Sequence, residues 1–312
     1  MQVLMTGDKG FVGSSTRGLL ETRGIEVVGY DLIDGFDIRD LDLLRATVIH
    51  HRPSHILHLA AIARFAEADD DPQTAINTNV LGTAHVARVA AEFQIPVVYA
   101  STGSVYMPIE KDPPITEEFP AHGNSVYACS KYVGEICVRY PVRWWEPFQL
   151  KSAPTQFIIL RYAHLYGKEK RGHGLIGGFL ERIERGLAPV LYGGRQSNDF
   201  CYINDVAEAN YLALTARPEA WNEIYNIGTG EELTAEDAGR IICEAADYNG
   251  TVSIVHGRTV DPLRFVYDIS KAEWLLKFKA RYGFREGLED MLKDGNFLSD
   301  GERGQVLETR SL

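Results

Sequence analysis

Cysteine is scarce in this chain, and the few cysteines form no recognisable pattern. The four residues Cys129, Cys137, Cys201 and Cys243 are scattered among 312 positions. None forms a Cys-x-x-Cys pair, and no spacing matches a metal site. We therefore expect buried or idle thiols in a reducing compartment, with no disulfide framework and no bound metal.

Long apolar runs and an excess of positive charge are also missing. No stretch is apolar over the roughly 20 residues that a membrane-spanning helix needs. The chain opens directly into a strand-like run, without the regions of a secretory signal, so we expect a cytoplasmic protein. The formal net charge of −11 disfavours nucleic acid or a membrane surface as the partner. A local arginine could still bind an anionic substrate.

Short apolar runs alternate with helical segments through the first half of the chain. We predict strands near 2–6, 26–30, 56–59, 96–100 and 157–161, and helices near 11–23, 41–51, 72–93 and 126–139. The strands are apolar without alternation, which is typical of strands buried on both faces. The order predicts an α/β fold with a doubly wound parallel sheet. Later helices are predicted near 204–216, 234–248 and 286–294.

A glycine-rich turn joins the first strand to the first helix. The segment Thr6–Gly13 has the spacing G-x-x-G-x-x-G. Missing Cβ atoms allow a tight turn near a pyrophosphate, and the helix N-terminus offers N–H donors and a positive dipole end. This setting predicts a Rossmann-type dinucleotide site. Its residues are Gly7, Gly10, Phe11, Val12 and Gly13.

Asp31 ends the second predicted strand. A carboxylate there would accept hydrogen bonds from the adenosine ribose and repel a 2′-phosphate. No arginine stands at this position or directly beside it, so we expect NAD rather than NADP. The other interpretation is that Asp31 caps a helix, although Asp34 could have that role instead.

Tyr127 and Lys131 stand four residues apart on one face of the helix predicted at 126–139. A lysine cation, with a positive nicotinamide ring close by, favours the phenolate, so Tyr127 could act as a base near neutral pH. Taken alone, the spacing would also fit a surface lysine beside a half-buried tyrosine. Its position after the glycine loop and the strand end at 100–106 favours catalysis, because ligands bind at the carboxyl ends of such strands. Thr102 is a candidate partner for the reacting oxygen.

With these motifs, the chain resembles the extended short-chain dehydrogenase/reductase family, in its NAD-dependent epimerase/dehydratase branch typified by UDP-galactose 4-epimerase. The resemblance extends to about residue 294. Its motifs are Thr6–Gly13, Asp31, Asp37–Ile38, His58–Ala61, Asn79–Thr83, Thr102–Tyr106, Tyr127 with Lys131, Leu160–Tyr162, Asp199–Val206, Tyr225–Gly230 and Asp268–Lys271.

The resemblance implies further roles around NAD. It implies that Asp37 and Ile38 flank the adenine, and that the cofactor is lined by Leu59, Ala60 and Ala61, with Asn79 and Tyr162 nearby. Lys131 would also hold the nicotinamide ribose. Tyr127 would take a proton from a sugar hydroxyl that Thr102 also contacts, while hydride moves to NAD. In an epimerase, the keto sugar turns over and receives the hydride on its other face.

Three places depart from the family pattern. Gly103 and Ser104 stand where the dehydratases carry an Asp-Glu pair, so 4,6-dehydration is not expected. Asn198 replaces the usual arginine before the Asp-Phe motif, and an asparagine cannot supply its charge to a diphosphate. Arg258 matches the other phosphate-binding arginine. Arg195 or Arg264 could compensate, although each arginine could also be a solvated surface charge.

The third departure is Ala163-His164 in place of Phe-Asn, where His164 either meets the substrate or has a structural role. The candidate substrate contacts are thus Thr102, Ser104, Tyr127, His164, Asn198 and Arg258. The segment 140–153, with Trp144 and Trp145, is longer than usual. We expect a surface insertion there, the alternatives being part of the substrate pocket or of a partner surface.

These observations predict an NAD-binding domain at 1–165, rejoined by about 196–228, a smaller α/β substrate lobe at 166–295, and a surface tail at 296–312. The expected function is that of an NAD-dependent nucleotide-sugar 4-epimerase. The alternative is a related dehydrogenase or reductase acting on a sugar or small hydroxy compound. A non-enzymatic NAD sensor is disfavoured by the complete set of Thr102, Tyr127 and Lys131. The family resemblance implies a homodimer, paired through helices near 73–93 and 126–139.

Overall fold

The computed structural model describes residues 1–106, 114–141, 155–168, 174–255 and 264–293. Three features expected from the sequence lie outside these ranges: most of the segment 140–153, the candidate Arg258, and the tail from residue 296. Within the described ranges, no helix is long and apolar enough to cross a membrane.

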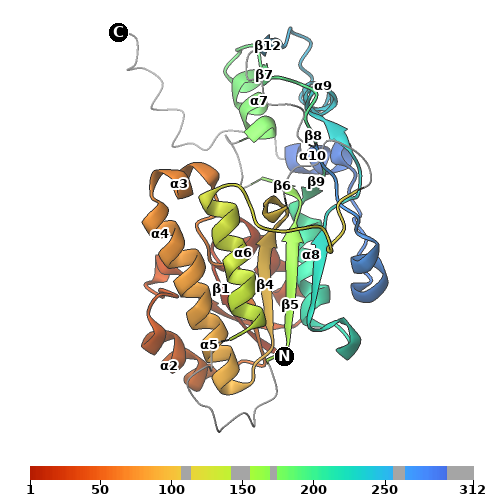
Figure 1. Cartoon of the computed structure of the whole chain (residues 1–312). Helices are drawn as coiled ribbons and strands as arrows, with labels where there is room; N and C mark the ends of the chain where they lie inside the picture. The colour runs from red at the N-terminus through yellow and green to blue at the C-terminus, as the bar shows by residue number, and fades with distance from the viewer. Residues whose placement is uncertain (107–113, 142–154, 169–173, 256–263, 294–312) are drawn as a thin grey trace.

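A six-stranded parallel sheet forms the centre of the molecule (Figure 1). Its strand order is β10-β5-β4-β3-β1-β2, and every neighbouring pair runs parallel. The strands are β1 (Gln2–Thr6), β2 (Glu26–Tyr30), β3 (His55–His58), β4 (Val97–Thr102), β5 (Phe157–Tyr162) and β10 (Glu223–Ile227). The predicted fold class, a doubly wound α/β sheet, is confirmed.

Helices cover both faces of this sheet, and alternate strand residues point to one layer or the other. On one face, α1 (Phe11–Thr22) and α8 (Ile203–Leu214) pack together near the buried Val3 and Met5. On the other face, α2 (Leu41–His51), α5 (Thr83–Phe93) and α6 (Val126–Arg139) lie over a second core that contains Leu4 and Tyr99. Two cores, one on each face, explain why the strands are apolar throughout.

The helix predicted over residues 72–93 is not continuous. It begins as α4 (Pro72–Ile76), passes through a π-helical turn, η2 (Asn77–Gly82), and continues as α5. A π turn widens the helix locally and is often found at functional sites. A further helix, α3 (Phe65–Asp70), which the sequence pattern does not predict, precedes α4.

Smaller strand pairs and helices form the rest of the described chain. Three small sheets join β6 (His164–Tyr166) to β9 (Phe200–Tyr202), β7 (Val190–Tyr192) to β12 (Ser253–Val255), and β8 (Ser197–Asn198) to both β11 (Leu233–Thr234) and β13 (Arg264–Phe265). The helices are α7 (Gly174–Glu184), α9 (Ala235–Ala245) and α10 (Phe284–Leu292), with short turns η1 (Leu32–Asp34), η3 (Gly103–Val105), η4 (Pro218–Ala220) and η5 (Ala272–Leu276). Figure 1 places α7 and α9 beyond the end of the sheet at which β5 leads into β6.

Candidate active site

The predicted site residues gather where the parallel strands end. Sheet register pairs Thr6 at the end of β1 with His58 at the end of β3, and it pairs Thr102 at the end of β4 with Tyr162 on β5. Because all strands run the same way, the glycine loop, the loop after β3 and Thr102 share one edge of the sheet.

The glycine loop is packed so tightly that two of its glycines have no room for a side chain. Gly7 has a φ of +71°, and a Cβ there would stand 2.7 Å from the backbone nitrogen of Ala60. A Cβ on Gly13 would stand 2.1 Å from the carbonyl oxygen of Gly7. Gly10 begins α1 and offers no side chain to cap it. The positive end of the helix therefore faces the loop, which suits a pyrophosphate.

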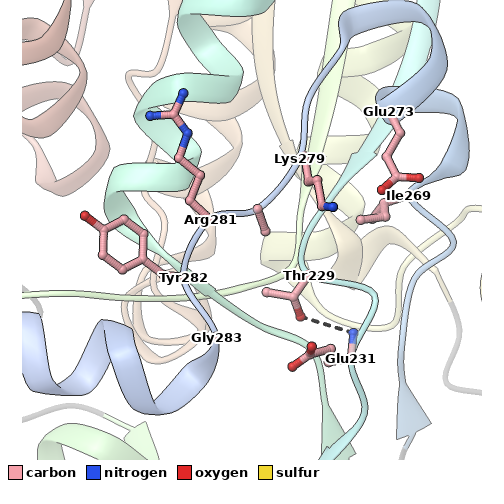
Figure 2. Close-up of a pocket in the computed structure, with 9 residues that line it drawn as sticks. Thr229, Glu231, Ile269, Glu273, Lys279, Arg281, Tyr282 and Gly283 are labelled. Carbon is pink, nitrogen blue, oxygen red and sulfur yellow. Dashed lines mark hydrogen bonds between the residues drawn. The ribbon is translucent and has the colours of Figure 1, made fainter.

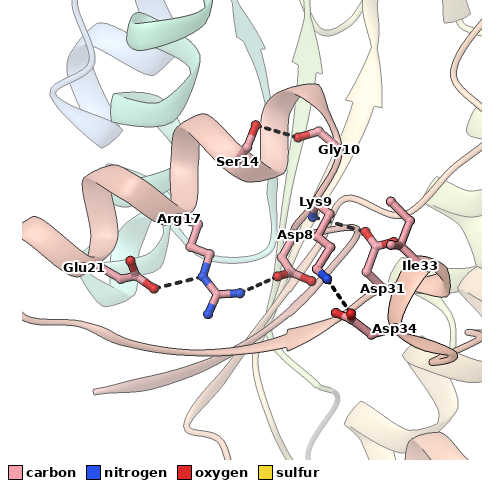
Figure 3. Close-up of polar contacts among 9 residues, drawn as sticks. All are labelled: Asp8, Lys9, Gly10, Ser14, Arg17, Glu21, Asp31, Ile33 and Asp34. Atoms are coloured by element: carbon pink, nitrogen blue, oxygen red, sulfur yellow. Dashed lines mark hydrogen bonds and ion pairs between the residues drawn. The ribbon is translucent and has the colours of Figure 1, made fainter. Parts of the chain in front are cut away.

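Asp31 lies beside this loop and is nearly buried (Figure 3). One carboxylate oxygen accepts from the backbone N–H of Lys9 (3.1 Å), and the other accepts from that of Ile33 (3.0 Å), which caps η1. Asp34 does not take the capping role, because its carboxylate pairs with the Lys9 ammonium. A carboxylate has about four acceptor positions, so Asp31 can cap η1 and still receive ribose hydroxyls.

The residues that the resemblance places at the adenine lie just after β2. Arg39 donates to both carboxylate oxygens of Asp37, from Nε to Oδ1 at 3.0 Å and from Nη2 to Oδ2 at 2.6 Å, and this hydrogen bonding keeps the Asp37 pKa below its ordinary value. Ile38 is buried, 4% exposed, and packs where a side chain on Gly82 of the π turn would collide with it.

Asn79, placed by the π turn, connects the loop after β3 to the helix α6. Its amide oxygen accepts from the backbone N–H of Ile62 (2.8 Å), and its amide nitrogen donates to the Ile62 carbonyl (3.0 Å) and to Ser130 Oγ (2.9 Å). Ser130 Oγ in turn donates to the carbonyl of Tyr127 (2.8 Å). Since Leu59, Ala60 and Ala61 immediately precede Ile62, this network fixes the expected cofactor loop relative to Tyr127.

The helix α6 presents Tyr127 and Lys131 on one buried face. Ser125 begins the helix by accepting from the backbone N–H of Ala128 (3.1 Å). Tyr127 is 9% exposed, and the ring of Phe65 from α3 meets it edge-on at 5.1 Å. Lys131 is 3% exposed, with its ammonium 4.2 Å from the ring centre of Tyr99.

Burial has the largest effect on the pKa values of Tyr127 and Lys131. It raises the pKa of Tyr127 above the ordinary value, opposed by the hydrogen bond with Thr102. It also lowers the pKa of Lys131 to about 7, opposed by the charge of Glu135. From these residues alone Tyr127 stays a neutral phenol at pH 7, so the expected phenolate needs the second positive charge, that of an oxidised nicotinamide ring.

A buried ion pair between Arg161 on β5 and Glu135 on α6 holds this helix against the sheet. The Arg161 guanidinium donates to Glu135 at 2.9 Å and 2.6 Å, and Ser101 Oγ donates to the same carboxylate at 2.5 Å. The two charged side chains are 3% and 1% exposed. Glu135 lies one helical turn beyond Lys131 on the same face, so the pair fixes α6 against β4 and β5.

Tyr162 lies next to Arg161 in β5, and its side chain reaches across to α8. The phenol donates to Asn210 Oδ1 (2.7 Å), and the Asn210 amide donates to Thr16 Oγ1 (3.1 Å). The residue expected near the nicotinamide is therefore anchored to helices on the other face of the sheet.

Three of the predicted substrate contacts gather at the end of β4, whereas His164 and Asn198 lie on other strands. The backbone N–H of Ser104 donates to Thr102 Oγ1 (3.2 Å), and Thr102 faces Tyr127. His164 is on β6, with its ring 5.1 Å from that of Phe200, and Asn198 is on β8.

The arginines considered as replacements at the diphosphate differ in their surroundings. Arg264 lies beside β8, where it pairs with Glu232 through Nε at 2.9 Å. Arg195 is exposed on the loop before β8. Arg264 is therefore already paired with a carboxylate, while Arg258 lies outside the described residues.

A surface pocket lies apart from these residues (Figure 2). Its lining includes Thr229, Glu231, Ile269, Glu273, Lys279 and Arg281. None of the predicted site residues contributes to it. Thr229 faces inward as well, where its N–H and hydroxyl donate to the buried Asp199 at 2.8 and 2.7 Å. The pocket therefore borders a structural turn rather than the Tyr127 cluster.

Possible metal ligands do not gather anywhere in the described part of the chain. No group of three or more His, Cys, Asp or Glu side chains there could hold a metal ion. The cysteines are unpaired: Cys201 and Cys243 are buried, Cys137 is partly buried and Cys129 is exposed.

Three residues around the site are not predicted from the sequence. Phe65 packs on Tyr127, Glu135 supports Lys131, and the phenol of Tyr267 lies against Gly103. Only Glu135 had a usable signal, because it repeats the four-residue spacing of Tyr127 and Lys131. Phe65 and Tyr267 come from distant segments with no motif of their own.

Comparison with known proteins gives consistent matches over nearly the whole chain. The model of the NAD dependent epimerase/dehydratase family matches residues 3–228. A Methanocaldococcus jannaschii protein, named as a candidate UDP-glucose 4-epimerase, is 28% identical over 96% of this chain and 99% of its own.

Solved structures agree with this. The Thermus thermophilus UDP-glucose 4-epimerase in complex with NAD is 28% identical, with a TM-score of 0.80 over 98% of this chain and 100% of that one. The Thermotoga maritima UDP-glucose 4-epimerase with UDP-glucose is 26% identical, with a TM-score of 0.83 over 94% and 98%. Nucleotide-sugar dehydratases and decarboxylases also occur among the matching proteins.

Proposed function

The chain belongs to the NAD dependent epimerase/dehydratase family, and on this premise we propose that it is a nucleotide-sugar 4-epimerase. The observation that carries the proposal is the grouping of Thr102, Tyr127 and Lys131 at the end of β4, tied to the loop after β3 through Asn79. The 4-epimerases that match over nearly the whole chain support it, and they suggest a UDP-sugar as substrate.

NAD is the cofactor of this family, and the residues of this chain fit it. Gly7 and Gly13, where a Cβ would collide with neighbouring backbone, allow the tight turn with which a dinucleotide-binding loop approaches a pyrophosphate. Asp31 would receive the adenosine ribose, and Lys131 would hold the ribose of the nicotinamide. When bound, NAD supplies a reversible hydride acceptor and a positive charge beside Tyr127.

The chain's own residues then account for the proton transfers. Tyr127 takes the proton of the sugar's 4-hydroxyl, Thr102 holds the same oxygen, and the Lys131 charge stabilises the phenolate. After the 4-keto sugar has turned over, Tyr127 returns the proton to the oxygen. General acid–base catalysis of this kind contributes about 10²- to 10⁴-fold to a rate.

Related activities in the family fit this chain less well. Dehydration needs an acid and a base next to Thr102, and Gly103 and Ser104 offer no carboxylate, so we propose that the protein is not a 4,6-dehydratase. A dehydrogenase or reductase remains the second candidate, because Asn198 replaces a charged contact to a diphosphate. We further propose that residues 1–165 and about 196–228 hold NAD while 166–295 mainly bind the substrate.

The proposal is tested with the purified protein and UDP-galactose, without added NAD. We expect UDP-glucose to form with no net NADH, as followed by nuclear magnetic resonance and by NADH fluorescence. Tyr127→Phe should abolish turnover while bound NAD is retained, and Tyr132→Phe, on the same helix, should remain active. Net NADH accumulation would favour the dehydrogenase, and near-normal rates in Tyr127→Phe would exclude the mechanism.

We also propose a homodimer that pairs the outer faces of α5 and α6. Apolar side chains on these helices and on η2 are 38–46% exposed: Leu81, Phe93, Val133 and Ile136. α5 and α6 contact each other (Figure 1), so these side chains can form one surface. Exposed apolar side chains on two neighbouring helices suit a twofold interface between identical chains.

A further inference from the structure

One phenol lies directly against the residue that follows Thr102. A Cβ built on Gly103 would stand 2.1 Å from the hydroxyl oxygen of Tyr267 and 2.4 Å from its Cζ. No real Cβ tolerates such contacts, so Tyr267 can occupy this place only because residue 103 is glycine. Its hydroxyl therefore lies next to the end of β4, at the residue that follows Thr102.

The backbone around Tyr267 is fixed from two sides. The N–H of Ile115 donates to the carbonyl of Val266 (2.8 Å), and the N–H of Asp268 donates to the carbonyl of Ile115 (2.8 Å). The Asn226 amide donates to the carbonyls of both Ile115 (2.9 Å) and Asp268 (3.2 Å). The phenol is thus held in position rather than placed by a mobile loop.

The hydroxyl of Tyr267 has no hydrogen-bond partner among the described residues, although the side chain is only 4% exposed. Its neighbour Tyr106, with ring centres 6.1 Å apart, instead donates to Asn226 Oδ1 (2.7 Å). The Tyr267 hydroxyl oxygen is not one of the fully buried polar atoms without a partner, so it keeps the access that a contact with a ligand needs. Burial and the charge of Asp199 also hold the Tyr267 pKa well above its ordinary value, so the group is a hydrogen-bond donor.

We propose that Tyr267 is a further substrate-contacting residue, whose phenol beside Gly103 donates a hydrogen bond to a hydroxyl of the sugar. This inference rests on the proposed function, because the reacting sugar must lie at Thr102 and Tyr127. The proposed hydrogen bond from Tyr267 to the sugar ring belongs to none of the sequence motifs. Tyr267 lies in a segment distant in sequence from the helix α6 that carries Tyr127. The same phenol fills the space that any larger residue at position 103 would need.

The test compares binding of UDP-glucose and of UDP to the NAD-loaded protein by calorimetry. Tyr267→Phe removes only the hydroxyl, so we expect about two- to tenfold weaker binding of UDP-glucose and unchanged binding of UDP. The melting temperature should not fall, because no protein hydrogen bond is lost. Gly103→Ala should reproduce the selective loss by displacing the phenol.

Tyr106→Phe is the matched control, because it removes a hydroxyl that is hydrogen-bonded within the protein. It should lower the melting temperature, and any change in affinity should be the same for UDP-glucose and for UDP. If Tyr267→Phe binds UDP-glucose as the natural protein does, or loses UDP equally, the inference is wrong and the proposed function stands. If the natural protein neither binds nor converts UDP-glucose, the proposed function fails and the inference fails with it.

Discussion

Replacing Lys131 by methionine should stabilise the protein while it destroys activity. Lys131 is 3% exposed, and burial lowers its pKa from 10.5 to about 7. Each step of one in pKa corresponds to about 1.4 kcal/mol, so the buried charge costs on the order of 5 kcal/mol of folding free energy. Methionine has a similar volume and no charge, so it avoids that cost.

The pH dependence of this effect has a definite sign. Below about pH 7 the lysine is charged in both the folded and the unfolded chain, so the full cost applies. Between about pH 7 and pH 10.5 only the unfolded chain keeps the proton, and the cost falls by about 1.4 kcal/mol per pH unit. The stability advantage of Lys131→Met should therefore be largest at low pH and decline as the pH rises.

Urea unfolding of the nucleotide-free proteins, from about pH 6 to about pH 9, measures this difference. At each pH, the free energy of unfolding of the natural protein is subtracted from that of the variant, so the titration of all other groups cancels. Lys279→Met, at an exposed lysine, is the control for the introduced methionine and should change the free energy of unfolding by less than about 0.5 kcal/mol. A pH-independent difference for Lys131→Met, or a loss of stability at pH 6, would refute the reasoning.

Two further predictions concern the helix α6. Arg161→Met should lower the free energy of unfolding by about 3–5 kcal/mol in urea titrations, because it leaves the buried Glu135 carboxylate without its cation; a loss below about 1 kcal/mol would contradict this. Ile136→Lys should halve the mass measured by light scattering, because it places a charge in the proposed dimer interface. Lys293→Ala, outside that face, should leave the mass unchanged. A natural protein that is already a monomer would contradict the interface.

Local patterns were enough to predict the sheet and the motifs at its edge. The unbroken apolar runs predicted five of the six strands in the parallel sheet, because burial on both faces leaves no alternation. The sixth, β10 (Glu223–Ile227), was not predicted as a strand. The glycine loop was predictable for a similar reason: at Gly7 and Gly13 the neighbouring backbone leaves no space for a Cβ. Family membership, first inferred from these motifs, is confirmed.

The remaining features depend on contacts that a local pattern does not contain. The helix at 72–93 has the same apolar character on both sides of residues 77–82, so the sequence gives no sign of the π turn that places Asn79. The environment of Lys131 depends on Tyr99 and Glu135 packing around it, and spacing alone predicted only a shared helix face. The substrate roles of His164, Asn198 and Arg258 stay predictions.

The contact between Gly103 and Tyr267 bears on how the family's reactions differ. In the sequence, Gly103 differs from the dehydratases only by lacking an acidic side chain after Thr102. In the structure, the phenol of Tyr267 fills the space into which a side chain at position 103 would project. Any side chain at 103 would therefore displace it. An acid at 103 would therefore require a smaller residue at 267 as well. Two positions 164 residues apart in the sequence are coupled by sterics, so the lack of an acid at 103, on which our proposal against dehydration rests, depends on packing as well as on chemistry.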